Sequence, residues 1–182
     1  RPLSLPGGTL RLSIADGADD AQRRALDTWI AKISRANFSA YGRLPLSDVQ
    51  LLIVPIGRSK EAVEFGQSTR GEGNALTLFV DPTQPASAFD RDWVAVHELS
   101  HLFHPYLGDR GSWLAEGLAT YYQNVLRARA GLLTAAQAWE QLDAGFARGR
   151  ASTRGHDVTL ENASAADDGR PNFGRIYWAG TA

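Results

Sequence analysis

HELSHLFHP, residues 97–105, places three histidines and one glutamate within eight positions before a proline. On an α-helix, His97 and His101 lie one turn apart on the same face, so both imidazoles can reach one metal ion. Glu98 is angled to the side of that pair, where its carboxylate can accept a proton without binding the ion. The alternative is a surface helix with two ordinary histidines, and this stretch alone does not decide between them.

A second stretch, SWLAEGLATYYQ (112–123), offers a third metal ligand. Fourteen residues separate His101 from Glu116, which suits two helices joined by a short glycine-containing loop. A catalytic zinc site has three protein ligands and one open position. Alone, Glu116 is more typical of a charge at a helix terminus. Beside HELSH, we predict that His97, His101 and Glu116 together bind one Zn²⁺.

HELSH followed by WLAEGLATYY resembles the gluzincin metallopeptidases, nearest to the aminopeptidase N and glycyl aminopeptidase groups. Their motifs read HExxH and then W-x-x-E-G-x-x-x-Y, although the separation between the two motifs is shorter here than in the aminopeptidase N group. The resemblance implies that His97, His101 and Glu116 are the zinc ligands and that Glu98 is the general base and proton shuttle. It also implies a zincin-like (thermolysin-like) fold and the hydrolysis of a peptide or protein substrate.

The end of the chain extends this resemblance. These families stabilise the oxyanion with a tyrosine in a Y-x-K-G-like segment, and the chain has Tyr177 in YWAG, with Ala179 where lysine is common. We therefore predict a catalytic role for Tyr177, at the start of a helix that continues beyond this sequence. The alternative is a tyrosine of the hydrophobic core.

The substrate side of the resemblance is less complete. The aminopeptidase N group holds the substrate amino group with the glutamate of a G-x-M-E-N segment. Aligning Asn74 with the asparagine of that motif places Gly73 where the glutamate stands, and Glu72 is one residue away, on the opposite face of a strand. The segment that begins at Asn74, Ala75 and Leu76 is predicted to bind extended peptide by strand addition. An endopeptidase, or a peptide-binding module without turnover, therefore stands beside an aminopeptidase as an alternative.

The hydrophobic periodicity predicts an α+β fold, in which a small mixed sheet packs on the HELSH helix and a helical subdomain follows. Residues 1–89 form the mixed α/β part of a single domain over 1–182, and residues 90–182 form the zinc-binding helical part. The expected strands are 9–14, 49–57 and 75–80; the expected helices are about 19–38, 90–104, 113–129 and 134–147; and the expected loops are 67–74 and 148–172. Asp19 or Asp20 is expected to cap the first helix.

The composition narrows the classes of function. The chain has 182 residues, 43% of them hydrophobic, a net charge of −1 and no cysteine. The charge argues against a nucleic-acid partner, and the absence of cysteine excludes disulfides and thiolate metal sites. No apolar run reaches the length of a membrane span. The first residue is not methionine, so we expect a fragment of a longer protein. A periplasmic or secreted location is consistent with this expectation, with the targeting signal outside the given sequence. The sequence predicts no oligomeric state.

Four polar side chains have weaker assignments. His104 is predicted to support the metal site without binding the ion, because Pro105 ends its helix a turn beyond His101. His156 falls in a polar loop and is expected to be solvated. Asp109 and Asp143 are both candidates for orienting the ligand imidazoles, because ligating histidines usually donate their second N–H to an acceptor.

Overall fold

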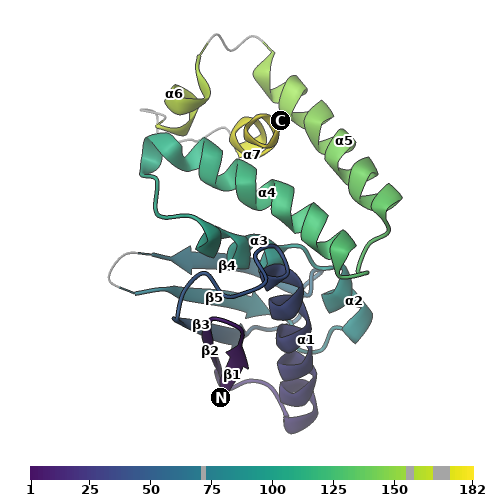
Figure 1. Cartoon of the computed structure of the whole chain (residues 1–182). Helices are drawn as coiled ribbons and strands as arrows, with labels where there is room; N and C mark the ends of the chain where they lie inside the picture. The colour runs from purple at the N-terminus through teal and green to yellow at the C-terminus, as the bar shows by residue number, and fades with distance from the viewer. Residues whose placement is uncertain (71–72, 155–157, 166–172) are drawn as a thin grey trace.

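The computed structural model describes residues 1–70, 73–154, 158–165 and 173–182. A sheet forms one end of the molecule and a group of helices forms the other, with helix α3 between them (Figure 1). The helices and short 3₁₀ turns are α1 (Asp20–Phe38), α2 (Ala86–Arg91), α3 (Val94–Ser100), η1 (His101–Phe103), η2 (Asp109–Gly111), α4 (Ser112–Arg129), α5 (Ala135–Thr153), α6 (Leu160–Ser164) and α7 (Phe173–Thr181). The predicted α+β layout is confirmed. None of the described helices combines the length and the hydropathy that a membrane span requires.

The sheet has five strands in the order β1-β2-β3-β5-β4, with β2, β3 and β5 parallel and both edge strands antiparallel. The strands are β1 (Pro2–Leu5), β2 (Gly8–Ile14), β3 (Asp48–Pro55), β4 (Val63–Thr69) and β5 (Ala75–Val80). The three predicted strands are confirmed as β2, β3 and β5. The prediction missed both edge strands and was wrong to begin a loop at residue 67, because β4 continues to Thr69. Polar residues and a glycine hide β4 in the sequence, and β1 is only four residues long.

One face of the sheet is buried under α1 and α3, on the side seen in Figure 1. On β3, Val49, Leu51 and Ile53 are buried while Leu52, on the other face, is 39% exposed. Strand alternation of this kind places one row of side chains in the core. Helix α1 buries the predicted apolar stripe of Leu26, Trp29, Ile30 and Ile33. Its N-cap is Asp19, which forms a reciprocal capping box with Gln22.

The helix predicted over 90–104 is broken into separate pieces, which corrects the prediction. Asp92 adopts an extended backbone, and its side chain accepts a hydrogen bond from the Ala95 backbone N–H at 3.1 Å, so α3 begins after it. Helix α3 ends at Ser100 and tightens into the 3₁₀ turn η1 before Pro105. The loop predicted over 148–172 is also partly wrong: α5 continues to Thr153 and α6 follows. His156, which was predicted to be solvated in this loop, lies outside the described residues.

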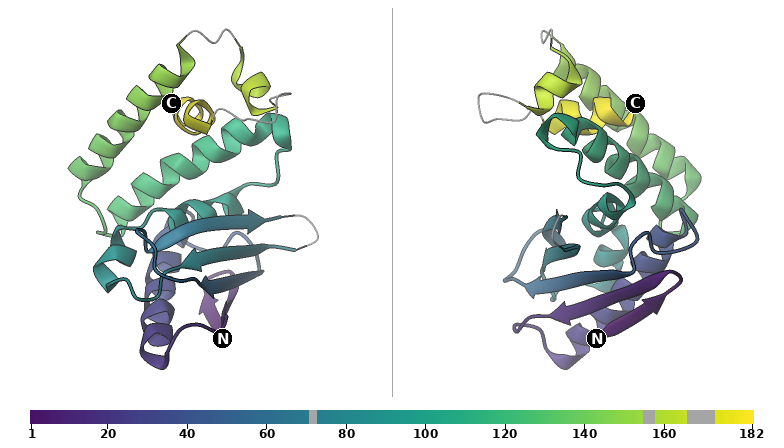
Figure 2. Two further views of the ribbon diagram at one scale, coloured as in Figure 1. Left: turned by 180° about the vertical axis from the view of Figure 1, so that it is seen from behind. Right: turned by 60° about the vertical axis from the view of Figure 1, so that its left-hand side comes forward.

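Two glycines allow helices to approach their neighbours closely enough to build the site. A Cβ on Gly66 of β4 would lie 2.6 Å from Cγ of Glu98, so the missing side chain lets α3 lie against the edge strand. A Cβ on Gly117 of α4 would lie 2.3 Å from the carbonyl of Gly180, so α7 rests directly on α4. The hydroxyl of Thr181 donates to the Gly117 carbonyl at 3.0 Å. Both views in Figure 2 show α7 held between α4 and α5.

We expect Gly117→Ala to lower the free energy of unfolding by about 1–3 kcal/mol, as overpacked sites do. Alanine favours a helix by about 1 kcal/mol over glycine, but here its methyl group meets backbone atoms of Gly180, which cannot rotate away. Chemical denaturation followed by circular dichroism measures the change. Gly57→Ala is the matched control, because a Cβ there meets nothing within 4 Å. A Gly117→Ala protein as stable as wild type would contradict this packing.

Candidate metal centre

The three predicted ligands converge at the junction of α3 and α4. The Nε2 atom of His97 lies 3.0 Å from Oε2 of Glu116, and Nε2 of His101 lies 3.5 Å from the same oxygen. One ligand atom from each residue falls within 4.8 Å of the others. His97 is 2% exposed and His101 is 3% exposed. Two imidazole nitrogens and a carboxylate oxygen facing one point are a donor set that suits a divalent metal ion.

The local sequence explains how these side chains reach one point. His97 and His101 stand four residues apart along α3, with His101 at its C-cap, so their rings lie on one face with centroids 4.9 Å apart. On the opposite face Ala95, Val96 and Leu99 are buried in the core, which fixes the rotation of α3. Glu116 stands in the second turn of α4. The first turn of that helix is held by α6, because the backbone N–H of Trp113 donates to Oγ of Ser164 at 3.0 Å.

The protonation states also fit a metal ion. Burial by itself would raise the pKa of Glu116, but hydrogen bonds from His101 and His97 outweigh it and hold that pKa well below its ordinary value. Burial lowers the pKa of His101, against the opposing effect of its hydrogen bond to Glu116. A metal ion binds neutral imidazole and ionised carboxylate. The directions of these two shifts favour the ionised carboxylate of Glu116 and the neutral imidazole of His101, the forms that bind a metal ion.

A residue that sequence analysis missed orients the first ligand. Gln123 of α4 places Oε1 2.8 Å from Nδ1 of His97. An amide oxygen only accepts, so Nδ1 carries the proton that Gln123 accepts, and Nε2 is the nitrogen that faces Glu116 and would bind a metal ion. The proposed orienting roles of Asp109 and Asp143 are not supported, because both side chains are exposed, and Asp109 accepts from Tyr106 instead. The available signal was spacing: Gln123 lies two helical turns after Glu116, on the same face of α4.

Glu98 lies between the metal-binding group and the edge strand β4. Burial has the largest effect on its carboxyl group and raises the pKa, and the negative charge of Glu116 raises it further. The charge of His97 and hydrogen bonds from Ser68 of β4 act in the opposite direction. The net result is a pKa above the ordinary value. A carboxylate of raised pKa is a better proton acceptor, and its place beside the ligands suits general base work.

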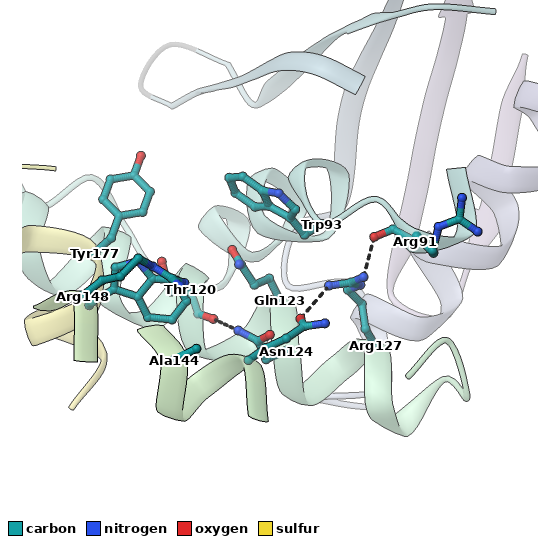
Figure 3. Close-up of a pocket in the computed structure, with 11 residues that line it drawn as sticks. Arg91, Trp93, Thr120, Gln123, Asn124, Arg127, Ala144, Arg148 and Tyr177 are labelled. Carbon is teal, nitrogen blue, oxygen red and sulfur yellow. Dashed lines mark hydrogen bonds between the residues drawn. The ribbon is translucent and has the colours of Figure 1, made fainter. Parts of the chain in front are cut away.

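Tyr177 reaches the same centre from α7. Its ring stacks on His97 with centroids 5.4 Å apart and planes 5° apart. Burial raises its pKa, and the charge and a hydrogen bond of Glu116 raise it further, so the hydroxyl stays protonated and able to donate. Figure 3 shows this hydroxyl directed away from α7, on the same side as Trp93. Tyr177 lies beside the ligands, and its catalytic role stays a prediction. It lies within α7, so the expectation that it begins a helix is wrong.

The chain is similar to known peptidases in part of its sequence and in its fold. The family model described as M61 glycyl aminopeptidase matches residues 102–179, which include Glu116 and Tyr177 and begin just after HELSH. Among solved structures, an aminopeptidase N family protein from Idiomarina loihiensis superposes with a TM-score of 0.65 at 14% identity. That match covers 100% of this chain but 35% of the other, so the chain spans about a third of its length. No curated protein matches the sequence.

The chain resembles the gluzincin metallopeptidases. The zincin-like fold predicted from its motifs is confirmed by the mixed sheet, the helices and this structural likeness.

The segment predicted to bind substrate, Asn74 to Leu76, does not have a free strand edge. Ala75 and Leu76 belong to β5, which is paired with β3 on one side and β4 on the other, and Leu76 is 1% exposed. A strand with both edges paired cannot add a peptide, so the prediction of strand addition at these residues is wrong. Asn74 accepts from the Gln50 backbone N–H at 3.0 Å. Among the described strands, the edge beside this gluzincin-like centre is β4. Glu72 lies outside the described residues.

His104 stands apart from the metal-binding group, as predicted for this gluzincin-like site. Its Nδ1 lies 3.0 Å from Nη1 of Arg70, and that same nitrogen donates to the carbonyl of His101 at 3.1 Å. Arg70 follows β4 directly, so it ties the edge strand to the end of the ligand helix. Sequence analysis missed Arg70, because nothing in the sequence distinguishes it from the other arginines.

Proposed function

We propose that the protein is a zinc-dependent peptidase of the aminopeptidase-like gluzincin type. The observation that carries the proposal is the convergence of His97, His101 and Glu116 between Glu98 on one side and Tyr177 on the other. Ser68 from residues 1–89 and the ligands from residues 90–182 meet at this point. We therefore treat the two halves as one catalytic unit.

The proposal assigns a role to each residue of the candidate metal centre. A zinc ion bound by the two histidines and Glu116 would polarise the scissile carbonyl and acidify a water molecule. Glu98 accepts the proton of the attacking water and returns it to the leaving amine. Tyr177 donates a hydrogen bond to the oxygen on which negative charge develops. The exposed edge of β4 offers backbone groups to an extended peptide.

The comparisons support the aminopeptidase type, because the matching family model is described as M61 glycyl aminopeptidase and the matched structure as an aminopeptidase N family protein. The glutamate that would hold the substrate amino group is not where the aligned motif places it, since that position is Gly73. An endopeptidase is therefore the second candidate, and a peptide-binding module without turnover is the third. Glu98 favours an enzyme, because a binding module has no use for a half-buried base beside the ligands.

The deciding experiment is digestion of a mixed peptide library by the zinc-loaded protein, followed by mass spectrometry. Half of the peptides carry a free N-terminus and half an acetylated one. Stepwise loss of single residues from free-amine peptides alone is the expected result, and it should disappear on chelation and return with zinc. Internal cleavage of both sets would instead identify an endopeptidase. Zinc binding with neither set cut would overturn the proposal in favour of a binding module.

We expect Gln123→Leu to weaken zinc affinity about 10- to 100-fold, as loss of a partner that orients a ligand does. Leucine fills similar space but leaves the Nδ1–H of His97 without an acceptor in a buried place. Competition with a chromogenic chelator measures the affinity. Gln123→Glu retains an acceptor and should keep affinity near the wild-type value, and Asp143→Leu should not change it. Equal affinities for Gln123→Leu and wild type would show that Gln123 does not orient His97.

A further inference from the structure

A cavity of about 490 Å³ lies beside the candidate metal centre, among α4, α5, α7 and the turn between α2 and α3 (Figure 3). Three of its lining residues also contact His97. Gln123 is within hydrogen-bond distance at 2.8 Å, Tyr177 stacks on the imidazole, and Trp93 meets it edge-on with centroids 5.7 Å apart. The cavity therefore borders His97 and Tyr177, next to the candidate metal centre.

All the charged residues that line the cavity in the described chain are arginines. Arg91, Arg127 and Arg148 line it, and its lining, drawn from the described residues, includes no aspartate or glutamate. Arg148 lies over the ring of Trp178, with its guanidinium carbon 4.6 Å from the centroid, which holds this exposed cation at the cavity. Arg127 and Arg148 bring guanidinium groups to this space, whereas Figure 3 shows Arg91 with its backbone carbonyl toward Arg127 and its guanidinium directed away. Two cations without acids in the cavity wall favour an anion as its occupant.

Arg127 is the buried member of the three, at 3% exposure. It donates to the carbonyl of Arg91 and weakly, at 3.5 Å, to Gln141, but its Nε has no partner among the described atoms. The charge of Asp92 opposes the lowering of the Arg127 pKa by burial, yet the two form no ion pair in the described chain. Thr120 Oγ1, 1% exposed, also lacks a partner there. Asp92 acts on Arg127 without a direct ion pair, so this buried guanidinium keeps an unused donor, and a bound carboxylate would offset the cost of burying it.

We propose that this cavity binds a carboxylate of the peptide substrate, so that the enzyme prefers substrates with an acidic group next to the scissile bond. The inference rests on the proposed peptidase function. Arg148 and Arg127 provide the charge, and the rings of Trp93 and Trp178 provide apolar walls for the methylene groups that carry the carboxylate. The carboxylate belongs either to an aspartate or glutamate side chain or to the C-terminus of a short peptide, since the same groups would bind both.

The turnover test uses the zinc-loaded protein and paired peptides. In the first set every peptide has an amidated C-terminus, and the two members of a pair differ only by Glu or Gln at one position near the scissile bond. In the second set no peptide contains an acidic residue, and the two members of a pair differ only by a free or an amidated C-terminus. We expect kcat/KM to favour the carboxylate partner by at least about tenfold in one set, as a charge-assisted contact does. The set that shows the preference identifies the source of the carboxylate.

A binding test without turnover separates this inference from the peptidase proposal. Calorimetry measures the affinity of the same peptides for the zinc-loaded Glu98→Gln protein. Arg148→Gln, an exposed change on α5 that leaves Arg127 in place, should reduce the preference for the carboxylate partner to nearly onefold. Arg150→Gln, on the same helix but outside the lining of this cavity, should leave it unchanged.

The outcomes are distinct. Cleavage with equal kcat/KM and equal affinity for the paired peptides would overturn the carboxylate site while leaving the peptidase proposal intact. Carboxylate-dependent binding that Arg148→Gln removes, without cleavage of any peptide by the wild-type protein, would support the site and overturn the peptidase. Equal effects of Arg148→Gln and Arg150→Gln would mean that general surface charge, not this cavity, attracts the peptide.

Discussion

Replacing Glu98 by glutamine is expected to reduce kcat by at least about 100-fold, the lower end of what a positioned general base contributes. Glutamine has nearly the same shape and keeps an acceptor toward Ser68, but it cannot take a proton from the attacking water. Glu98 is not one of the three ligands, so zinc stoichiometry should stay at the wild-type value. Initial rates on the best peptide from the library, with zinc measured by emission spectroscopy, give both quantities.

Two features make this test decisive. Because partial burial raises the pKa of Glu98, we expect a neutral amide there to cost little stability, and circular dichroism of the variant separates lost activity from unfolding. Glu61→Gln, an exposed change before β4, is the matched control and should retain full activity. A Glu98→Gln protein with more than a few per cent of the wild-type rate would rule out the proposed role of Glu98.

The sequence was sufficient for the features that depend on local periodicity. The spacing of His97 and His101 fixed their common face, and the apolar stripe of α1 and the strands β2, β3 and β5 were recognisable because each buries one row of side chains. Glu116 could be assigned because WLAEG begins a helix at a distance that one short loop can span. In each case the sequence pattern that reveals the element lies within one short stretch of the chain.

The features that sequence analysis missed depend on contacts between distant segments. Strand β4 has few apolar residues, and Gly66 within it is explained by the side chains of Glu98 and Val94 that occupy the space above it. The partner of His97 is Gln123, a neutral residue that no charge pattern singles out. The arginine-lined cavity requires α2, α4 and α5 to be placed together, and no single stretch of sequence contains it.

Tyr177→Phe is expected to lower kcat about 100- to 1,000-fold, the cost of removing one donor to a developing oxyanion. Phenylalanine retains the ring that stacks on His97, so the position of α7 and the affinity for zinc should be unchanged. A donor that acts only when charge develops affects kcat, with little change in KM. Tyr121→Phe, on α4 and 42% exposed, is the control that removes a hydroxyl from the surface and should have no effect.

The form of the result separates two roles for Tyr177, since it lines the arginine cavity as well as the metal centre. If its hydroxyl stabilises the oxyanion, every peptide should lose kcat by the same factor, with or without a carboxylate. If Tyr177 served the cavity alone, KM would rise only for peptides with a carboxylate, and kcat would stay near the wild-type value. The stacked ring and the hydroxyl directed at Glu116 favour the first result, because they hold the donor over the metal-binding group.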